Sequence, residues 1–506
     1  MPERRAGLIA AVAVLALCNG ADRSVARAQP GDWSRAGGSG IEWVRAIHCD
    51  NTDLLLVYTR AGTLDLYRAD DGAIVEGSGV AVGRGLRFAA AHAQPPLAPT
   101  AAQTAAATAE ECADAGIELR ILCFDRSAVY ELAVSPQVLR MTRRLGSAFL
   151  TPDQAPGDPE FSPAIIDAGV TSIGPVALRS DGALAAFIEG PPMLLAGPGK
   201  SAAPRFLLVD PNGTALVLFT AGAASQATVY AFDDEAPAAE SATRPPAGRE
   251  LVLERGAGVL ASHVAGGALI VITRDRAEII PARDEHAPRV RIPGARFRAD
   301  GVAFVRRARP ISGAAAAIPP TDETLLLRST VDGRIWAWRI PGGDIAWRTP
   351  PGALRRDTNE ADATPARAAP PRLLDSQGAW SCWLHEGCVW GIRNADGLIG
   401  GTIALPRDGE LLCACVRDTA AGPSLMIAIR DGHGVAALEL PIFAPGEKLR
   451  AGGNQLRNRA VDHPPRVARL PDAPDPATAI LLADRVVLHD ADQLRVYHLR
   501  RSARSP

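Results

Sequence analysis

The sequence has almost no lysine, few cysteines and no long apolar run beyond its N-terminal segment. Of its 54 basic residues, only Lys200 and Lys448 are lysines, a bias that a GC-rich genome explains better than phosphate binding does. The formal net charge of −2 provides no overall field that would attract nucleic acid or an anionic membrane. No later segment approaches the length of a membrane-spanning helix, so we expect a soluble mature chain.

Helical periodicity is also nearly absent. Short apolar runs of strand length, separated by turns, take its place. The clearest copy of this pattern begins with Leu54–Tyr58, which is continuously apolar, as in a strand covered on both faces. After a second strand, the Asp70–Gly72 turn has hairpin chemistry, because glycine accepts the positive φ that such turns demand. Ala73–Val75 is the expected third strand.

Similar copies recur at intervals of roughly 40 to 65 residues, which is the range of propeller blades with insertions. They lie at Leu119–Met141, Val176–Ile188, Phe206–Phe219, Ala268–Ile280, Leu325–Trp347, Cys388–Gly397, Leu425–Gly432 and Ile480–Tyr497. The sequence therefore predicts an all-β chain that forms a seven- or eight-bladed β-propeller. A β-sandwich array and two stacked β domains are the alternative architectures.

Segments rich in alanine and proline separate these copies. They can bury little apolar area, so we expect disordered inter-blade loops there. These insertions lie near residues 89–115, 235–248, 311–320, 350–371 and 454–476. The predicted organisation is a signal peptide over 1–28, a propeller over 29–500 that contains these insertions, and a tail over 501–506.

The first 28 residues have the features of an export signal. Arg4–Arg5 is a basic start, Leu8–Cys18 is an apolar core, and Ala26–Ala28 offers a small-x-small cleavage site. We therefore expect an exported chain, in the lumen or at the membrane of the endoplasmic reticulum in a eukaryote, and periplasmic or extracellular in a bacterium. A lipid anchor on Cys18 is an alternative, although Leu17 stands where a lipoprotein signal has a small residue.

Loss of the signal leaves seven of the eight cysteines, so at least one thiol would be free or intermolecular. The densest group surrounds a histidine and consists of Cys382, Cys388, Cys413 and Cys415. We interpret these four as packing on adjacent strands or as candidates for one or two disulfides. Their Cys-x5-Cys and Cys-x-Cys spacing matches a zinc site poorly.

Other motifs fall short of the patterns that their chemistry needs. Gly197–Ser201 resembles the end of a phosphate-binding loop, but Leu194 replaces the first required glycine. The nine histidines are scattered, and none accompanies a serine or cysteine nucleophile motif. Asn212 opens an Asn-Gly-Thr pattern, a candidate glycosylation site in a eukaryotic host. We therefore predict no catalytic, cofactor-binding or metal-binding residues.

The tract Val331–Thr349 resembles the repeat of pyrroloquinoline-quinone-type, WD40-like β-propellers. A blade of that family has an Asp-Gly pair, an aromatic-Ala-aromatic strand, a glycine turn and a strand with tryptophan. The matching residues here are Asp332-Gly333, Trp336-Ala337-Trp338, Gly342-Gly343 and Trp347. The resemblance implies that Trp336, Trp338 and Trp347 pack between blades. It also raises the alternative of a quinoprotein oxidoreductase, although the sequence has no adjacent cysteines and no recognisable ligand set for quinone and calcium.

Residues 1–76 also resemble the start of subunit 1 of the endoplasmic-reticulum membrane protein complex. Members of that family have a signal peptide, an acidic-Trp pair matched here by Asp32-Trp33, and then a blade like Leu54–Val75. The resemblance implies a lumenal propeller that binds sibling subunits of a membrane-protein insertase and has no catalytic residues. That family is longer, with a second propeller region, a further C-terminal domain and a transmembrane helix that this sequence does not contain.

These features together predict an exported, non-enzymatic scaffold for protein–protein interaction. We expect protein partners, specifically subunits of a membrane-associated complex, with no cofactor and no nucleic acid. The alternative classes are a quinoprotein-type oxidoreductase, a hydrolase with a pocket at the propeller axis, and a bacterial periplasmic or outer-membrane assembly lipoprotein. Converging carboxylates in a funnel at the axis would favour an enzyme.

Overall fold

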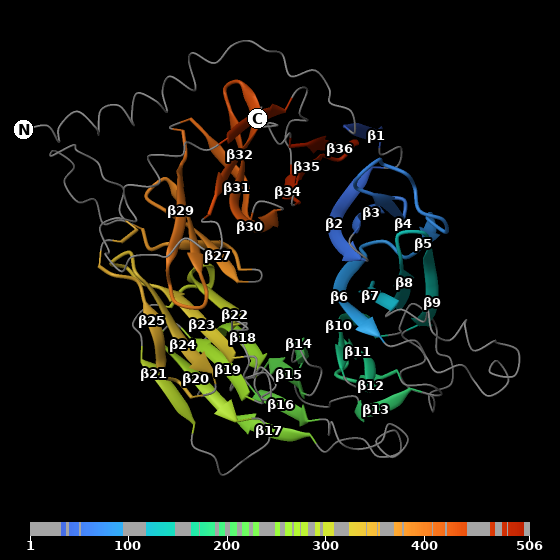
Figure 1. The fold of residues 1–506 in the computed structure, drawn as a ribbon. Helices are drawn as coiled ribbons and strands as arrows, with labels where there is room; N and C mark the ends of the chain where they lie inside the picture. The colour runs from blue at the N-terminus through green and yellow to red at the C-terminus, as the bar shows by residue number, and fades with distance from the viewer. Residues whose placement is uncertain are drawn as a thin grey trace, which may run out of the picture. The chain divides into compact units, whose positions relative to one another are not determined.

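The chain folds into β-strands joined by tight turns, and every four strands form a sheet (Figure 1). Neighbouring strands pair antiparallel, as in the first sheet. The computed structural model describes residues 32–36, 40–49, 52–94, 118–146, 163–171, 173–187, 192–197, 203–209, 215–221, 226–231, 248–252, 259–265, 268–273, 275–281, 289–293, 297–307, 323–340, 342–351, 353–354, 369–376, 379–406, 408–419, 422–442, 466–470, 478–482 and 484–499. The chain divides into unit 1, residues 1–35 and 297–506, and unit 2, residues 36–296.

Unit 2 contains five sheets in which spatial order follows chain order. Their strands are β2 (Ile41–Cys49), β3 (Thr52–Thr59), β4 (Thr63–Arg68) and β5 (Val80–Ala81); β6 (Arg87–Gln94), β7 (Glu118–Phe124), β8 (Ala128–Val134) and β9 (Leu139–Gly146); β10 (Ile165–Thr171), β11 (Gly174–Arg179), β12 (Leu184–Ala186) and β13 (Met193–Ala196); β14 (Ala203–Val209), β15 (Ala215–Ala221), β16 (Gln226–Ala231) and β17 (Arg249–Val252); and β18 (Val259–Ala265), β19 (Ala268–Thr273), β20 (Arg276–Pro281) and β21 (Val290–Pro293).

Unit 1 contains four sheets and a short 3-10 turn, η3 (Ala299–Gly301). The strands are β22 (Val302–Arg307), β23 (Glu323–Ser329), β24 (Ile335–Ile340) and β25 (Ile345–Arg348); β26 (Arg372–Asp375), β27 (Trp380–His385), β28 (Cys388–Arg393) and β29 (Ile399–Ala404); β30 (Glu410–Thr419), β31 (Gly422–Asp431), β32 (Gly434–Pro441) and β33 (Arg466–Leu470); and β34 (Thr478–Leu481), β35 (Arg485–His489) and β36 (Gln493–His498) with β1 (Trp33–Ala36).

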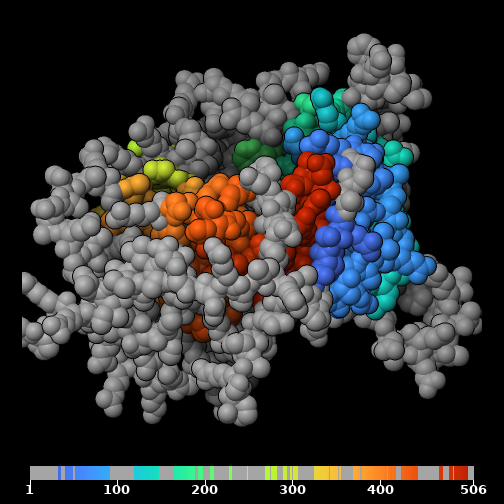
Figure 2. Space-filling model, turned by 90° about the horizontal axis from the view of Figure 1, so that it is seen from above, coloured from blue at the N-terminus to red at the C-terminus, as the bar shows by residue number. Residues whose placement is uncertain are grey.

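The middle strands of each sheet are covered on both faces, which explains their continuously apolar sequences. Leu54, Leu55 and Leu56 of β3 have no exposed surface. Because successive residues point to opposite faces, Leu54 and Leu56 join one apolar layer, which includes Ile121 and Leu132 of the next sheet. The space-filling view shows the first strands of unit 2, in blue, packed side by side as one continuous block (Figure 2).

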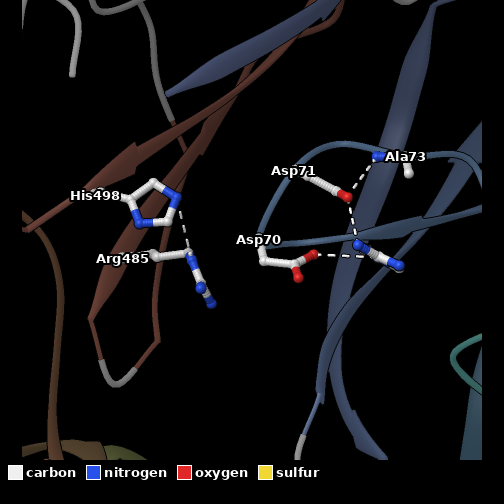
Figure 3. Close-up of polar contacts among 6 residues, drawn as sticks. Asp70, Asp71, Ala73, Arg485 and His498 are labelled. Atoms are coloured by element: carbon white, nitrogen blue, oxygen red, sulfur yellow. Dashed lines mark hydrogen bonds and ion pairs between the residues drawn. The ribbon is translucent and has the colours of Figure 1, made fainter. Parts of the chain in front are cut away.

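The two ends of the described chain meet in one sheet of unit 1. β1 is the outer strand beside β36, and the order is β1-β36-β35-β34. The Asp32 carboxylate accepts a hydrogen bond from the backbone N–H of His498 at 2.8 Å. Arg485 lies on β35, which pairs with β36, and its Nε atom is 3.4 Å from Nε2 of the His498 ring (Figure 3). The N-terminal strand thus completes the C-terminal sheet.

The all-β propeller that the sequence predicted is confirmed. The described strands form nine four-stranded sheets, whereas the repeats predicted seven or eight blades. Each of the nine copies named in the sequence, including the weakly patterned Phe206–Phe219, lies in a sheet of its own. No helix in the described part of the chain has the length and hydrophobicity needed to cross a bilayer.

Three predicted insertions overlap ordered structure. The first residues of 89–115 belong to β6, because alanines pair with β7 through backbone hydrogen bonds that need no large side chain. β33 lies inside 454–476 and is the outer strand of its sheet, with Val467 exposed and Leu470 buried. Leu354, inside 350–371, is fully buried. The predicted signal peptide, the tail, residues 311–320 and most of 235–248 lie outside the described residues.

The expected strand at Ala73–Val75 is also corrected. This segment forms an isolated antiparallel bridge between Tyr67 and Ile74, with two backbone hydrogen bonds to β4, and not a full strand. The outer strand of that sheet is β5, which pairs with β4 at Thr63 and Leu64. Val75 is nevertheless 4% exposed and joins the apolar layer, which explains why this segment has the composition of a strand.

Asp32→Ala removes the acceptor that fixes the N-terminal strand to β36. We expect the free energy of unfolding to fall by about 1 kcal/mol, measured by urea denaturation, because a half-buried backbone donor loses its partner. Asp70→Ala is the matched control, since Asp70 is an exposed turn carboxylate whose solvated ion pair should contribute little. Equal losses in the two variants would contradict the role assigned to Asp32.

Candidate functional site

The tryptophans expected to pack between blades lie on the third and fourth strands of the sheet β22–β25. Trp336 and Trp338 of β24 are stacked, with ring centroids 5.7 Å apart. Trp338 is buried, and Trp336 is partly exposed. The guanidinium of Arg348, on β25, lies 5.7 Å from the centre of the Trp336 ring, a cation–π contact. The two indoles therefore pack against each other on β24, and Trp336 also contacts Arg348 of the paired strand β25.

Trp347 connects this sheet to the next one in unit 1. Its indole N–H donates a hydrogen bond to the backbone carbonyl of Asn394, 2.8 Å away, just after β28. Gly397 lies against the ring, because a Cβ added at this residue would come within 2.4 Å of the Trp347 Cε3 atom. The Asp-Gly turn of one sheet is thus shaped to seat the tryptophan of the preceding sheet.

The cysteines expected to be disulfide candidates are distributed over three layers between sheets. Cys388 packs against β22–β25, and Cys382 lies between β26–β29 and β30–β33. Cys415 and its neighbour Cys413 pack against β34–β36. Cys413 and Cys415, two residues apart on β30, point to the same face, whereas Cys382 and Cys388 lie in other layers. All six described cysteines are thiols in this structure, and pairing among the four stays a prediction.

Burial makes these thiols poor nucleophiles and poor metal ligands. It raises the pKa of Cys123, Cys413 and Cys415 to about 12. The thiolate is the form that attacks electrophiles and binds metals, and it is scarce at neutral pH when the pKa is this high. Within the described ranges, no group of three or more His, Cys, Asp or Glu residues is placed to hold a metal ion.

Two aspartates at β-bulges were missed by the sequence analysis. Asp167 lies at a bulge in β10, and its Oδ2 accepts a hydrogen bond from the backbone N–H of Leu207 on the next sheet, at 2.8 Å. Its Oδ1 accepts from the N–H of Ala168 at 2.9 Å. Asp375 lies at the equivalent bulge in β26 and accepts from the N–H of Ser376 at 2.9 Å. Burial raises the pKa of Asp167.

A chain of hydrogen bonds joins the first two sheets of unit 2. The Tyr130 hydroxyl donates to Asp125 Oδ2 at 2.7 Å and accepts from the N–H of Gly83 at 3.0 Å, whose carbonyl accepts from Tyr58 at 2.8 Å. Burial alone raises the pKa of Asp125, but hydrogen bonds from Tyr130 and Ser127 outweigh it and lower the pKa. Burial, together with Asp125, raises the pKa of Tyr130. The carboxylate therefore stays ionised and the phenol protonated.

Arginine–aspartate contacts close the exposed hairpin turns. The Arg68 guanidinium contacts Asp70 at 3.3 Å and also contacts Asp71, and both carboxylates lie at the turn (Figure 3). Asp71 also accepts from the N–H of Ala73 at 2.9 Å. Equivalent contacts occur in the hairpin turns at Arg179–Asp181 and Arg393–Asp396, and in the 3-10 turn η3 at Arg298–Asp300. Both partners are exposed at most of these turns, so each contact adds little stability.

Some of these residues had a sequence signal and others did not. An arginine two or three residues before the aspartate of a turn is visible in the sequence and could have been read as a recurring turn closure. The partners of Asp125 and Asp167 depend on which sheets are neighbours, and a bulge has no sequence signature of its own. Asn212, the candidate glycosylation residue, lies outside the described residues.

No protein-family model and no curated protein matches the chain. Solved structures similar to it include the computationally designed Ika8 protein, at 10% identity over 79% of this chain and 96% of that chain, with a TM-score of 0.39. The WD40 domain of SCAP from fission yeast is 8% identical over 93% of this chain and 99% of that chain, with a TM-score of 0.42. BamB from Moraxella catarrhalis is 14% identical over 66% of this chain and 94% of that chain, with a TM-score of 0.29. The fold assignment therefore rests on the strand pairing of this chain.

The buried thiols make a prediction about labelling. With iodoacetamide at pH 8, we expect Cys123, Cys413 and Cys415 to react only after unfolding in guanidinium chloride, because burial and a pKa of about 12 suppress the thiolate. Mass spectrometry of the labelled protein, without reductant, would count the modified cysteines. Cysteines that resist labelling even after unfolding would instead be oxidised pairs, contrary to the structure.

Asp167 makes a prediction about pH. Its folded-state pKa is raised, so the folded protein binds this proton more tightly than the unfolded chain, and the resulting stability is lost as pH rises through the folded pKa. Asp167→Asn keeps an acceptor for Leu207 and should flatten the dependence of unfolding free energy on pH above the ordinary aspartate pKa. Asp167→Ala should cost about 1–3 kcal/mol by urea denaturation. An unchanged pH profile in the asparagine variant would contradict this assignment.

Proposed function

We propose that the chain is a non-catalytic scaffold that binds protein partners on a rigid set of docked sheets. The observation that supports this best is that its chemically capable side chains hold sheets together. Trp347 binds the turn of the next sheet, Asp167 binds the next inner strand, and Asp125 accepts a hydrogen bond from Tyr130. Sheets fixed in this way present their turns and outer strands in a constant geometry, which suits recognition.

We further propose that the chain is exported and serves as a subunit of a membrane-associated complex similar to the endoplasmic-reticulum membrane protein complex. The Asp32-Trp33 pair carries that resemblance, and in this chain Asp32 fixes β1 to β36. Cleavage after Ala28 would leave both residues and the whole of β1 in place. Export is therefore compatible with the contact that completes the last sheet.

Affinity purification tests both the binding of protein partners and the export to a membrane-associated complex. The full chain, tagged after Pro506, would be purified from digitonin-solubilised native membranes, and its partners and N-terminus would be identified by mass spectrometry. We expect subunits of a membrane-protein insertase to co-purify with a chain that begins at Gln29. A matched chain that lacks residues 1–28 should stay in the cytosol and recover none of them.

Two results would contradict the proposal. Recovery of cytosolic partners with an intact Met1 would exclude the exported subunit while leaving a binding scaffold. Stoichiometric uptake of pyrroloquinoline quinone and calcium by the purified chain, with reduction of a dye, would identify an oxidoreductase and exclude the non-catalytic role.

A further inference from the structure

Two outer strands of unit 2, β9 and β21, combine an exposed sheet edge with an excess of arginine. Among the described strands, each has a neighbour on one side only. β9 carries Arg140, Arg143 and Arg144, β21 carries Arg291 with Arg289 just before it, and neither strand contains an acidic residue. A sheet edge presents backbone N–H and C=O groups to an added strand, and arginine favours a strand with carboxylates.

In both sheets a buried glutamate on the adjacent strand lies near two arginines, although Arg120, one of the two at Glu131, belongs to β7 and not to the outer strand. Glu131 of β8 lies 3.3 Å from Arg120 and 4.0 Å from Arg143. Glu278 of β20 lies 3.6 Å from Arg289 and 3.9 Å from Arg291. The glutamate side chains are 5% and 8% exposed, whereas Arg289 and Arg291 are 43% and 62% exposed. At β21 the buried carboxylate therefore lies near two guanidiniums and leaves net positive charge at the outer edge. At β9, Arg143 also donates to the Phe187 carbonyl at 3.0 Å, and the guanidinium of Arg144 lies 5.8 Å from the centre of the Tyr130 ring.

The geometry of these contacts differs from that of the turn arginines. Arg68 directs two of its nitrogens at turn carboxylates. Arg289 and Arg291 each approach Glu278 through one nitrogen, beyond hydrogen-bond distance. A guanidinium has five N–H donors, so most of the donors of these exposed side chains face solvent. Glu278 keeps the guanidiniums of Arg289 and Arg291 near this edge, and their other N–H groups can bind a further carboxylate.

The start of β9 already pairs with an extended acidic residue from the neighbouring sheet. Glu76 forms a parallel bridge with Val138. The N–H of Leu139 donates to the Glu76 carbonyl at 2.8 Å, and the N–H of Glu76 donates to the Gln137 carbonyl at 3.1 Å. Gly77 then turns the chain away with a φ of +79°. This contact shows how a strand can be added at this edge, and the rest of β9 has no second strand beside it among the described residues.

We propose that the outer edge of β9, with that of β21 as a second copy, docks an extended acidic segment of a partner protein by strand addition. This inference rests on the proposed scaffold function and adds its surface and the chemistry of its partner. The segment pairs its backbone with the strand edge, and its carboxylates contact the exposed arginines. An anionic lipid surface would engage the arginines alone, whereas an acidic peptide uses both features.

A synthetic probe tests strand addition directly. A fluorescein-labelled peptide of alternating glutamate and valine, matched to the eight residues of β9, would be titrated with the full chain by fluorescence anisotropy. We expect two peptides to bind each chain, with affinity that falls as salt rises. The same peptide with alternate backbone amides N-methylated should bind at least about tenfold more weakly, because it cannot complete the pairing. A lysine–valine peptide should not bind.

Arginine variants locate the two edges. Arg140→Gln with Arg144→Gln, and Arg289→Gln with Arg291→Gln, should each reduce the stoichiometry from two peptides to one. The four substitutions combined should abolish binding of the probe. Arg68→Gln with Arg298→Gln removes the same charge from turn arginines and should leave binding unchanged. Thermal melts would show that each variant is folded.

Four outcomes would overturn the proposal. The first is binding that N-methylation of the probe does not weaken, and the second is equal loss in the turn-arginine control. The third is binding of phosphatidylserine vesicles, but not of the peptide, through the same arginines. Co-purification of the same partners with the four-substitution variant as with the natural chain would also reject these edges, yet it would leave the scaffold function intact.

Discussion

Burial of both faces of each sheet is the constraint on which the rest of this structure depends. A single sheet with Leu54, Leu55 and Leu56 on its second strand would expose apolar surface on either side, and each such side chain contributes about 1.5–3 kcal/mol when it is fully buried. The sheets of a unit satisfy this by stacking, so that each apolar layer is shared by two neighbours. Any polar group within these layers must then find a partner there, which is why Asp125 and Asp167 are hydrogen-bonded by the adjacent sheet or by their own turn.

The same constraint decides how much the sequence could predict. Runs such as Leu54–Tyr58 and Leu325–Leu327 identified the second strands, because a strand covered on both faces has an unbroken apolar sequence. Turns with Asp-Gly were also readable, since glycine provides the φ of +74° found at Gly333 and Gly397. Outer strands such as β33 were not recognised, because one open face makes them partly polar. The site was harder still: Trp347 could be singled out, but its partner Asn394 depends on which sheet is its neighbour.

The buried and exposed polar contacts play different parts in this arrangement. The turn pairs, such as Arg68 with Asp70, are solvated and contribute little free energy, although they recur and fix the direction of the hairpins. The carboxylate of Asp167 is costly to bury, and burial raises its pKa, yet its bond to Leu207 orients one sheet against the next. Specific orientation therefore comes from a few buried acceptors, and the bulk of the stability comes from the apolar layers.

Open edges are a liability for any stack of sheets, because an exposed strand can pair with another copy of itself. Arginine on β9 and β21 opposes this, since two identical edges would bring like charges together. The identity of these residues carries little information, because nearly all basic residues of the chain are arginines. Their position carries more: in a chain with a net charge of −2, positive charge gathers on strands whose inner neighbours hold a single buried glutamate. The charge that prevents self-association therefore also favours a complementary, acidic strand.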